Sequence, residues 1–340
     1  MNVQQALAVL FERRHLSMQD MTDVMQQVMT GEASPAQIGA FLAALRMKGE
    51  TVDEVAAAAS VMRSLAAKVT VDASAIDIVG TGGDSTSTFN ISTCCALVAA
   101  AAGVKVAKHG NRSVSSKSGA ADFLETAGVN IELEPDEVAT CVDKVGVGFM
   151  FAPRHHSAMK HAIGPRKEMG VRTVFNLLGP LTNPAGAKRM LLGVYDAAWV
   201  ETMANVLHKL GSEHVLVVHG DGGMDEISLS GSTHVAELKN GQVTQYEIKP
   251  ELFGITPQPI DGIRVEGPEQ SLAMIQSVLA NEDGPAKDIV LMNAGAALYV
   301  GGAADGIESG VDQARKVLAD GSAAAKLNEL ATLTQGFKHE

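Results

Sequence analysis

The apolar and polar positions of residues 1 to about 70 follow a pattern that predicts helices only. The expected helices lie near 3–11, 18–30, 35–47 and 52–68. Capping signals support the last three, namely Ser17-x-x-Asp20, Ser34 before Pro35, and Thr51-x-x-Glu54. We therefore expect a small helical unit, in which no motif indicates chemistry.

From about residue 76 onward, short apolar runs alternate with glycine-containing loops and helical stretches. The runs predict a strand that ends at Val79 and further strands at 104–107, 147–151, 190–195 and 214–219. The expected helices are 92–102, 120–127, 135–145, 198–210, 269–280, 287–300, 306–320 and 321–332. The repeated order of strand, loop and helix predicts a mainly parallel α/β sheet. Its loops should share the carboxyl edge, where such sheets hold ligands.

Two segments depart from this alternation. The runs 233–239 and 243–248 flank Asn240-Gly241, a strong turn dipeptide, and predict an antiparallel hairpin. The stretch Asn176–Pro184 is turn-rich, and we expect it to return the chain to the sheet.

The glycine loop Gly80-Thr81-Gly82-Gly83-Asp84 follows the first predicted strand, and the helix after it can be capped by Asn90, Ser92 or Thr93. Such a loop presents backbone N–H groups and a helix N-terminus to an anion, which favours phosphate binding. The pattern matches neither the dinucleotide fingerprint nor the P-loop. A plain strand-to-helix turn remains the alternative at this point.

A second polar loop, 108–119, follows the next predicted strand. Between Ser85 and Ala121 the chain has no Asp or Glu, whereas it has Lys105, Lys108, Arg112 and Lys117. The whole protein has a formal net charge of −12, which disfavours nucleic acid or an anionic membrane as its main partner. A basic pocket on an acidic body favours a polyanionic small molecule, and the alternative is a solvated charged loop.

Two further stretches are candidates for chemistry. Residues 153–172 are rich in histidine and basic side chains, but Glu168 is their only carboxylate, so substrate contact is favoured over metal binding. Asp225 and Glu226 follow the strand predicted at 214–219 and are candidate Mg²⁺ ligands. A solvated surface pair is the alternative interpretation.

Composition narrows the class of protein. A chain of 340 residues with 46% hydrophobic but only 4% aromatic content favours closely packed α/β structure. The adjacent Cys94 and Cys95 lie in an apolar helical run, so we interpret them as small buried hydrophobes and not as a disulfide. We expect a cytosolic protein, because the sequence has no signal peptide and no apolar run of membrane-spanning length.

Taken together, the glycine loop, Asn90-Ile91-Ser92-Thr93, 108–113, Gly164-Pro165-Arg166, 176–184 and Met224-Asp225-Glu226 resemble the anthranilate phosphoribosyltransferases over nearly the whole chain. The resemblance implies the nucleoside phosphorylase/phosphoribosyltransferase fold. This fold has a helical domain, 1–70 with a contribution from about 160–185, and an α/β domain, 71–340. It also implies a homodimer formed through the helical domains. The implied reaction converts anthranilate and phosphoribosyl diphosphate to N-(5-phosphoribosyl)anthranilate and diphosphate, a step of tryptophan biosynthesis.

The resemblance also implies roles for individual residues. Mg²⁺ would be held by Ser92, Asp225 and Glu226, and anthranilate by Gly80, His109, Asn111 and Arg166. Arg166 suits the substrate carboxylate because its fork is bidentate, Asn111 would orient the amine, and His109 is a candidate proton acceptor. Phosphoribosyl diphosphate would contact Gly80, Gly82, Gly83, Asp84, Thr88, Asn90, Ile91, Ser92, Thr93, Lys108, Gly110, Asn111, Arg112, Ser113, Ser115, Ser116 and Ala120. The family often has serine at the position of Ala120; the alanine removes one side-chain contact, for which a backbone N–H can serve.

Two other functions stay open at this point. A pyrimidine nucleoside phosphorylase on the same fold would use phosphate as the nucleophile and would not need the Asp225-Glu226 pair. A non-catalytic relative that binds nucleic acid would show a basic surface and degraded loops, in contrast to the acidic chain and intact loops here.

Overall fold

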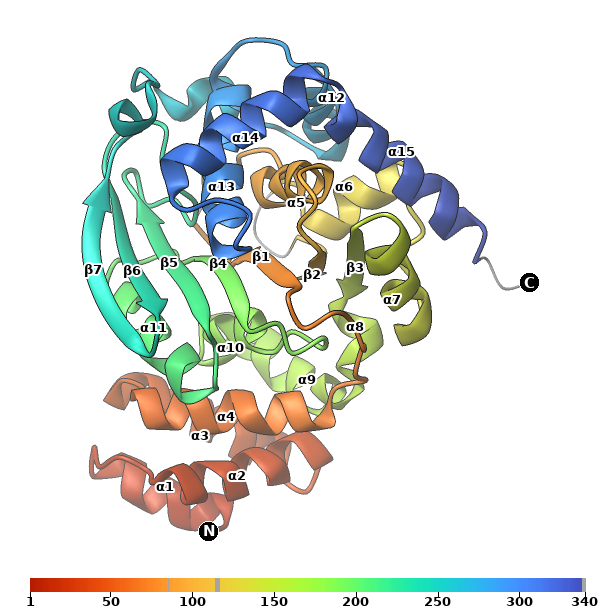
Figure 1. The fold of residues 1–340 in the computed structure, drawn as a ribbon. Helices are drawn as coiled ribbons and strands as arrows, with labels where there is room; N and C mark the ends of the chain where they lie inside the picture. Colours follow the sequence, from red (N-terminus) through yellow and green to blue (C-terminus); the bar gives the residue numbers. More distant parts are fainter. Residues whose placement is uncertain (85, 114–116, 338–340) are drawn as a thin grey trace.

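The computed structural model describes residues 1–84, 86–113 and 117–337. Four helices form the amino-terminal part: α1 (Val3–Phe11), α2 (Met18–Thr30), α3 (Pro35–Lys48) and α4 (Val52–Leu65). Figure 1 shows them grouped at one end of the molecule, with α9 (Lys160–Met169) and α10 (Phe175–Leu181) between them and the sheet. The helical unit thus includes segments that are far apart in the chain.

Local side-chain caps explain where these helices begin. At the start of α3, where Pro35 is the first helical residue, the Ser34 side chain accepts a hydrogen bond from the Gln37 N–H. At the start of α4, the Thr51 side chain accepts one from the Glu54 N–H. Glu54 also accepts the Leu16 N–H at 2.9 Å and pairs with Lys48 at 2.8 Å. The predicted helices and caps are confirmed, and the same carboxylate joins three segments of the helical core.

The described residues form a seven-stranded sheet of order β3-β2-β1-β4-β5-β6-β7. Strands β1 to β5 are parallel, and β6 and β7 form an antiparallel hairpin at one edge. The order reverses between β1 and β4, which is where open α/β sheets bind ligands. The strands are β1 (Ile76–Gly80), β2 (Val106–Gly110), β3 (Val147–Phe151), β4 (Arg189–Gly193), β5 (His214–Gly220), β6 (Thr233–Lys239) and β7 (Gln242–Ile248).

Successive side chains of the strands enter two different hydrophobic cores. Leu191 of β4 packs in the core beneath α5 and α13, whereas its neighbour Leu192 packs in the core shared with α11 and the helical unit. The sheet is therefore buried on both faces, as parallel sheets require. The other helices are α5 (Ile91–Ala101), α6 (Ala120–Thr126), α7 (Pro135–Lys144), α8 (Ala152–His155), α11 (Trp199–Lys209), α12 (Pro268–Leu279), α13 (Pro285–Val300), α14 (Ile307–Ala319) and α15 (Ser322–Gln335).

The fold confirms the predicted α/β class but corrects two segments. Strand β2 is Val106–Gly110, so Lys108 and His109 lie in a buried strand and not in a loop. The stretch expected to be turn-rich is helical over Phe175–Leu181, because Gly179 and Pro180 fall only in its last turn. Cys94 and Cys95 are free and buried, as expected. Within the described residues, no helix is both long and apolar enough to cross a membrane.

Candidate active site

The glycine loop after β1 packs directly against the loop after β5. Asp225 Oδ2 accepts the Gly82 N–H at 2.7 Å, although the two residues are 143 positions apart. A Cβ atom on Gly80 would lie 2.3 Å from the same oxygen, so only glycine permits this approach. Gly82 and Gly83 have φ of +67° and +78°, a region that other residues rarely adopt. The structure brings together the two loops that the sequence marked.

The carboxyl groups of Asp225 and Glu226 are partly buried and close to each other. Burial, followed by the charge of Asp84, raises the pKa of Asp225 to about 7. Burial and the neighbouring Asp225 raise the pKa of Glu226 well above its usual range. These raised pKa values do not fit a pair of solvated surface carboxylates. Two carboxyl groups of like charge that are partly shielded from water are instead suited to bind a hard cation.

Lys108 is a buried cation whose charge acts on this pair. Its Nζ donates to the Ser92 hydroxyl at 3.1 Å and to the Ile78 carbonyl oxygen, and it faces Asp77 and Glu226. Burial lowers the pKa of Lys108, an effect that those two carboxylates oppose. The Ser92 backbone N–H acts to lower the pKa of Glu226, so the N-terminus of α5 favours a carboxylate at this place.

A polar network beneath the site fixes β1 and β2. Asp77 accepts the His109 backbone N–H at 3.2 Å and the Asn183 side-chain amide at 2.7 Å. Burial raises the pKa of Asp77 to about 6, although the nearby Lys108 acts in the opposite direction. Sequence reasoning assigned no role to Asp77 or Asn183, although Asp77 lies in an apolar run and Asn183 lies in the stretch 176–184 that contributed to the family resemblance.

Asn90 joins the first glycine loop to the second. Its Oδ1 accepts hydrogen bonds from the Ser118 and Ser271 hydroxyls, each at 2.7 Å, and its Nδ2 donates to the Ser118 carbonyl at 3.1 Å. Asn90 is the residue before α5, but its side chain makes no capping bond, so the cap expected of Asn90 does not form. The side chain instead holds two site loops together.

The second loop is not the unpaired basic surface that its sequence suggested. Arg112 pairs with Glu125 and, at 3.4 Å, with Asp122, both of which lie just past the acid-free stretch. Lys117 is 3.5 Å from Glu266. The interpretation of missing counter-charge was therefore wrong for these two side chains, because α6 and a distant loop supply the acids.

His109 is buried and neutral. Burial, with smaller contributions from His156 and His155, holds its pKa well below the usual range. The nearby Gly179 carbonyl acts in the opposite direction on this pKa, and Nε2 has no hydrogen-bond partner among the described residues. The His156 ring lies 5.0 Å away. An unprotonated Nε2 can accept a proton or hydrogen bond, but the lowered pKa makes it a weak base.

Arg166 lies on α9, in the helical unit, with its guanidinium 5.0 Å from the centroid of the Phe175 ring. Burial lowers its pKa, and no carboxylate in the described part of the chain pairs with it. No described hydrogen bond joins it to the loops after β1, β2 and β5. Arg172, three residues past α9, does reach Gly83 of the glycine loop.

Other predicted site residues lie at the same edge of the sheet, and two fall outside the described residues. Gly110 ends β2, Ala120 begins α6, and Ile91 begins α5. Thr88 forms a bridge with Arg264. Ser115 and Ser116 are not among the described residues. The residues described at this edge are Gly80, Gly82, Gly83, Asp84, Thr88, Asn90, Ile91, Ser92, Thr93, Gly110, Asn111, Arg112, Ser113 and Ala120.

Gly193, at the end of β4, is a residue that sequence reasoning missed. A Cβ there would lie 1.6 Å from the Asp225 carbonyl oxygen, so the loop after β5 crosses directly over this strand end. A glycine within a predicted strand often marks such a close approach, and this was the available signal.

The donor atoms fit Mg²⁺ better than a softer metal. Within the described residues, no group of three or more His, Cys, Asp or Glu side chains could hold a metal ion. The available set is the two carboxylates, Asp225 and Glu226, with the Ser92 hydroxyl nearby. Mg²⁺ commonly uses one or two carboxylates and takes its remaining ligands from water and substrate phosphates.

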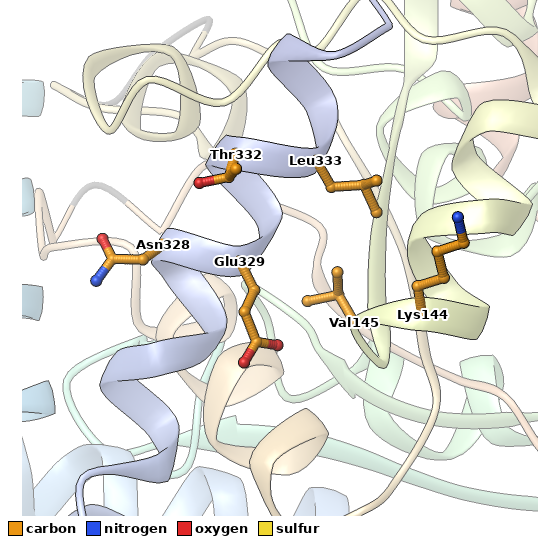
Figure 2. A pocket seen from close by; sticks show the side chains of 6 residues that line it. All are labelled: Lys144, Val145, Asn328, Glu329, Thr332 and Leu333. Carbon is orange, nitrogen blue, oxygen red and sulfur yellow. The ribbon is translucent and has the colours of Figure 1, made fainter.

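Two cavities lie away from this edge. One, of about 540 Å³, lies between α15 and the end of α7, and Figure 2 shows Leu333 pointing toward Val145 while Asn328 and Thr332 point to the other side of α15. The other, of about 760 Å³, includes Arg189 and His214, the first residues of β4 and β5. Both are at the amino ends of strands, opposite the site loops.

Comparisons with known proteins agree with this geometry. Residues 4–66 match the glycosyl transferase family helical bundle domain, and residues 72–324 match the glycosyl transferase family a/b domain. An anthranilate phosphoribosyltransferase from Thioalkalivibrio sulfidiphilus is 58% identical over 98% of this chain and 99% of its own. One from Methylococcus capsulatus is 57% identical over 99% of each chain.

Solved structures extend the similarity to three dimensions. The anthranilate phosphoribosyltransferase of Thermus thermophilus superposes with a TM-score of 0.92 at 42% identity, covering 97% of this chain and 99% of that one. The enzyme from Saccharomyces cerevisiae in complex with PRPP and Mg gives a TM-score of 0.90 at 26% identity, covering 98% of both chains. With these matches over nearly its full length, the chain belongs to the anthranilate phosphoribosyltransferase family.

Proposed function

We propose that this protein transfers the phosphoribosyl group of 5-phosphoribosyl 1-diphosphate to the amine of anthranilate and releases diphosphate. The observation that carries the proposal is the 2.7 Å hydrogen bond from Gly82 to Asp225, which joins an anion-binding glycine loop to a cation-binding carboxylate pair. A diphosphate and its cation need both features side by side. The relatives at 57–58% identity support the choice of substrates.

We infer that Ser92, Asp225 and Glu226 hold Mg²⁺, and that the Gly80–Asp84 backbone binds the diphosphate. When bound, Mg²⁺ neutralises charge on the leaving group. The chain contributes a preformed donor set, since Gly80 and Gly193 allow the loop after β5 to approach the glycine loop closely. Preorganised groups of this kind stabilise charge that develops only as the glycosidic bond breaks.

Lys108 and the loop that begins at Asn111 are proposed to hold the phosphoribosyl part. Lys108 is buried beside Ser92 and Glu226, so it can neutralise the carboxylates before substrate arrives and face the substrate phosphates afterwards. Asn90 fixes the distance between the two loops through Ser118. Substrate would thus be held between loops that the chain itself ties together.

For anthranilate, Arg166 is proposed as the carboxylate partner, because it is a partly buried guanidinium without a described counter-charge. Asn111 would orient the amine, and Gly80 and His109 would line the same place. An aromatic amine has a free lone pair, so positioning can suffice without a strong base. The lowered pKa of His109 agrees with an acceptor of modest strength.

We also infer a division into a helical domain, 1–70 with about 160–185, and an α/β domain, 71–340. A homodimer through the helical domains is supported by apolar side chains exposed on that unit: Phe11, Met18 and Met47. Analytical ultracentrifugation at micromolar concentration should give a dimer, and a fully active monomer would contradict this inference.

The decisive experiment is an assay of anthranilate fluorescence. Fluorescence should fall only when phosphoribosyl diphosphate and Mg²⁺ are both present, and chelation should stop the reaction. A pyrimidine nucleoside phosphorylase would instead release a base from a nucleoside in the presence of phosphate. No loss of anthranilate fluorescence under any Mg²⁺ concentration would contradict the proposed function.

A further inference from the structure

We propose that Arg172 is a positioning residue that couples the anthranilate subsite to the diphosphate subsite. It lies three residues past α9, the helix that carries Arg166, and its side chain reaches the glycine loop. The inference rests on the proposed function for the identity of the two ligands, but the contacts that carry it are independent of that assignment.

Arg172 makes contacts with three separate segments. Its Nη2 donates to the Gly83 carbonyl oxygen of the glycine loop, and its guanidinium lies 4.2 Å from the centroid of the Tyr195 ring. Its own carbonyl oxygen accepts a hydrogen bond from Arg46 Nη1 of α3 at 2.7 Å. One residue therefore connects the helical unit, the glycine loop and the segment after β4.

Two segments that are far apart in the chain hold the glycine loop. Asp225, from the α/β part, accepts the Gly82 N–H, and Arg172, from the helical side, donates to the Gly83 carbonyl. Between these two contacts, Gly82 and Gly83 have positive φ and no side chain that could fix the backbone. The position of Gly83 is thus set partly by a residue of the segment that carries Arg166.

An arginine suits this position because it can donate and stack at once. The planar guanidinium lies over Tyr195 while its N–H groups point to a carbonyl, a geometry that lysine cannot reproduce. The Tyr195 N–H also donates to the Thr81 hydroxyl at 3.1 Å, so the surface on which Arg172 stacks belongs to the same loop assembly. Both contacts favour one arrangement of the loop relative to α9.

A ligand bound at one of the two subsites should therefore favour the arrangement of Arg172 and the glycine loop that suits the ligand at the other subsite. Anthranilate at Arg166 would order α9 and the residues after it, and diphosphate at the glycine loop would order Gly83. Coupling of this kind is reciprocal for binding free energies. Loss of Arg172 should remove the coupling while leaving each ligand's own contacts in place.

The test measures anthranilate binding by fluorescence, with and without Mg²⁺-diphosphate, a pair that cannot react. For the wild-type protein we expect diphosphate to tighten anthranilate binding on the order of 10-fold, within the usual range of coupling between sites. For Arg172→Leu the factor should fall to about twofold or less, with the affinity for each ligand alone changed far less. Arg172→Lys, which keeps the charge, should lose the coupling as well.

A matched control is Arg315→Leu. Arg315 Nη2 donates to the Phe253 carbonyl at 2.9 Å, so its loss removes the same kind of hydrogen bond far from the site. Thermal unfolding of each variant checks that the fold is intact. Wild-type coupling in Arg172→Leu or Arg172→Lys would overturn the inference, as would loss of diphosphate binding measured alone, because that result marks Arg172 as a direct ligand contact. Failure of the wild-type protein to bind either ligand would overturn the proposed function itself.

Discussion

Near one end of β5 lies a carboxylate with a lowered pKa, and past the other end lie two carboxyl groups with raised pKa values. Near its amino end, Glu237 of β6 accepts hydrogen bonds from His214 Nε2 at 3.0 Å, from Tyr246 at 2.9 Å and from Tyr299 at 2.7 Å. Burial alone would raise the pKa of Glu237, but the hydrogen bonds from His214, Tyr299 and Tyr246 lower it to about 2. This carboxylate is fully partnered and stabilises the edge of the sheet.

Past the carboxyl end of β5, the pKa values of Asp225 and Glu226 are shifted in the opposite direction. Burial and like charges raise both pKa values, that of Asp225 to about 7. The Gly82 N–H donates to Asp225, and the Ser92 N–H and the Lys108 charge act to lower the pKa of Glu226 without reversing its shift. A carboxylate whose hydrogen-bond partners all come from the protein contributes to folding stability. Two carboxylates that repel each other instead destabilise the site, and a bound cation can relieve this repulsion.

The largest effect should come from the double substitution Asp225→Asn with Glu226→Gln. It conserves volume but removes both negative charges that would face the cation. We expect kcat/KM to fall by about 10²-fold or more, the scale for one preorganised electrostatic group. Steady-state kinetics over a range of Mg²⁺ should recover part of the loss at high metal, because mass action offsets weaker binding.

Asp221→Asn is the matched control for this pair. Asp221 is an exposed residue in the same loop, and its backbone N–H donates to the Ser232 carbonyl, a bond that the substitution keeps. Its activity and its Mg²⁺ dependence should equal those of the wild type. If the double variant behaved like this control, the two carboxylates would be a surface feature with no part in binding the metal.

A smaller effect is expected from Arg166→Ala. The variant removes the proposed partner of the anthranilate carboxylate, so the KM for anthranilate should rise roughly 10- to 100-fold, as for loss of charged hydrogen bonds. The KM for phosphoribosyl diphosphate should change little. Lys167→Ala, the exposed neighbour, is the control, and equal changes in both KM values for Arg166→Ala would refute the assignment.

At the other end of β5, Glu237→Gln should affect stability and not catalysis. The amide keeps the shape but loses the charge that accepts three hydrogen bonds, which should lower the free energy of unfolding by about 2 kcal/mol. Urea unfolding measures this change. Glu247→Gln is the control, because the Glu247–His234 pair is half exposed and should contribute only about 0.5 kcal/mol. A large fall in kcat for Glu237→Gln would contradict the separation of the two ends.

The smallest effect is the pH dependence of that stability. Because the folded pKa of Glu237 is about 2, below its usual value of 4.5, its contribution is fully present above pH about 4.5 and is lost as pH falls toward 2. The difference in unfolding free energy between wild type and Glu237→Gln should therefore shrink below pH about 4.5. A difference that stayed constant from about pH 6 to about pH 3 would show that the charge of Glu237 is not what stabilises the sheet edge.

Local features of this protein followed directly from its sequence. Ser34 with Pro35 and Thr51 with Glu54 mark helix starts through bonds that span three residues, and Asn240-Gly241 forms the predicted turn with φ of 52° and 73°. The parallel order also followed, since strands that alternate with helices have few other ways to pack. These features depend on residues that are close together in the chain, so the residue types alone were enough to predict them.

Features that depend on distant partners were decided only by the tertiary structure. Lys108 and His109 were predicted in a loop because they are polar, yet Asp77, Ser92 and the Ile78 carbonyl make their burial in β2 possible. The contact of Arg172 with Gly83 and that of Asp225 with Gly82 likewise join residues 89 and 143 positions apart. Whether a charged side chain is free, paired or buried depends on which segments meet it in space, and spacing along the chain does not contain that information.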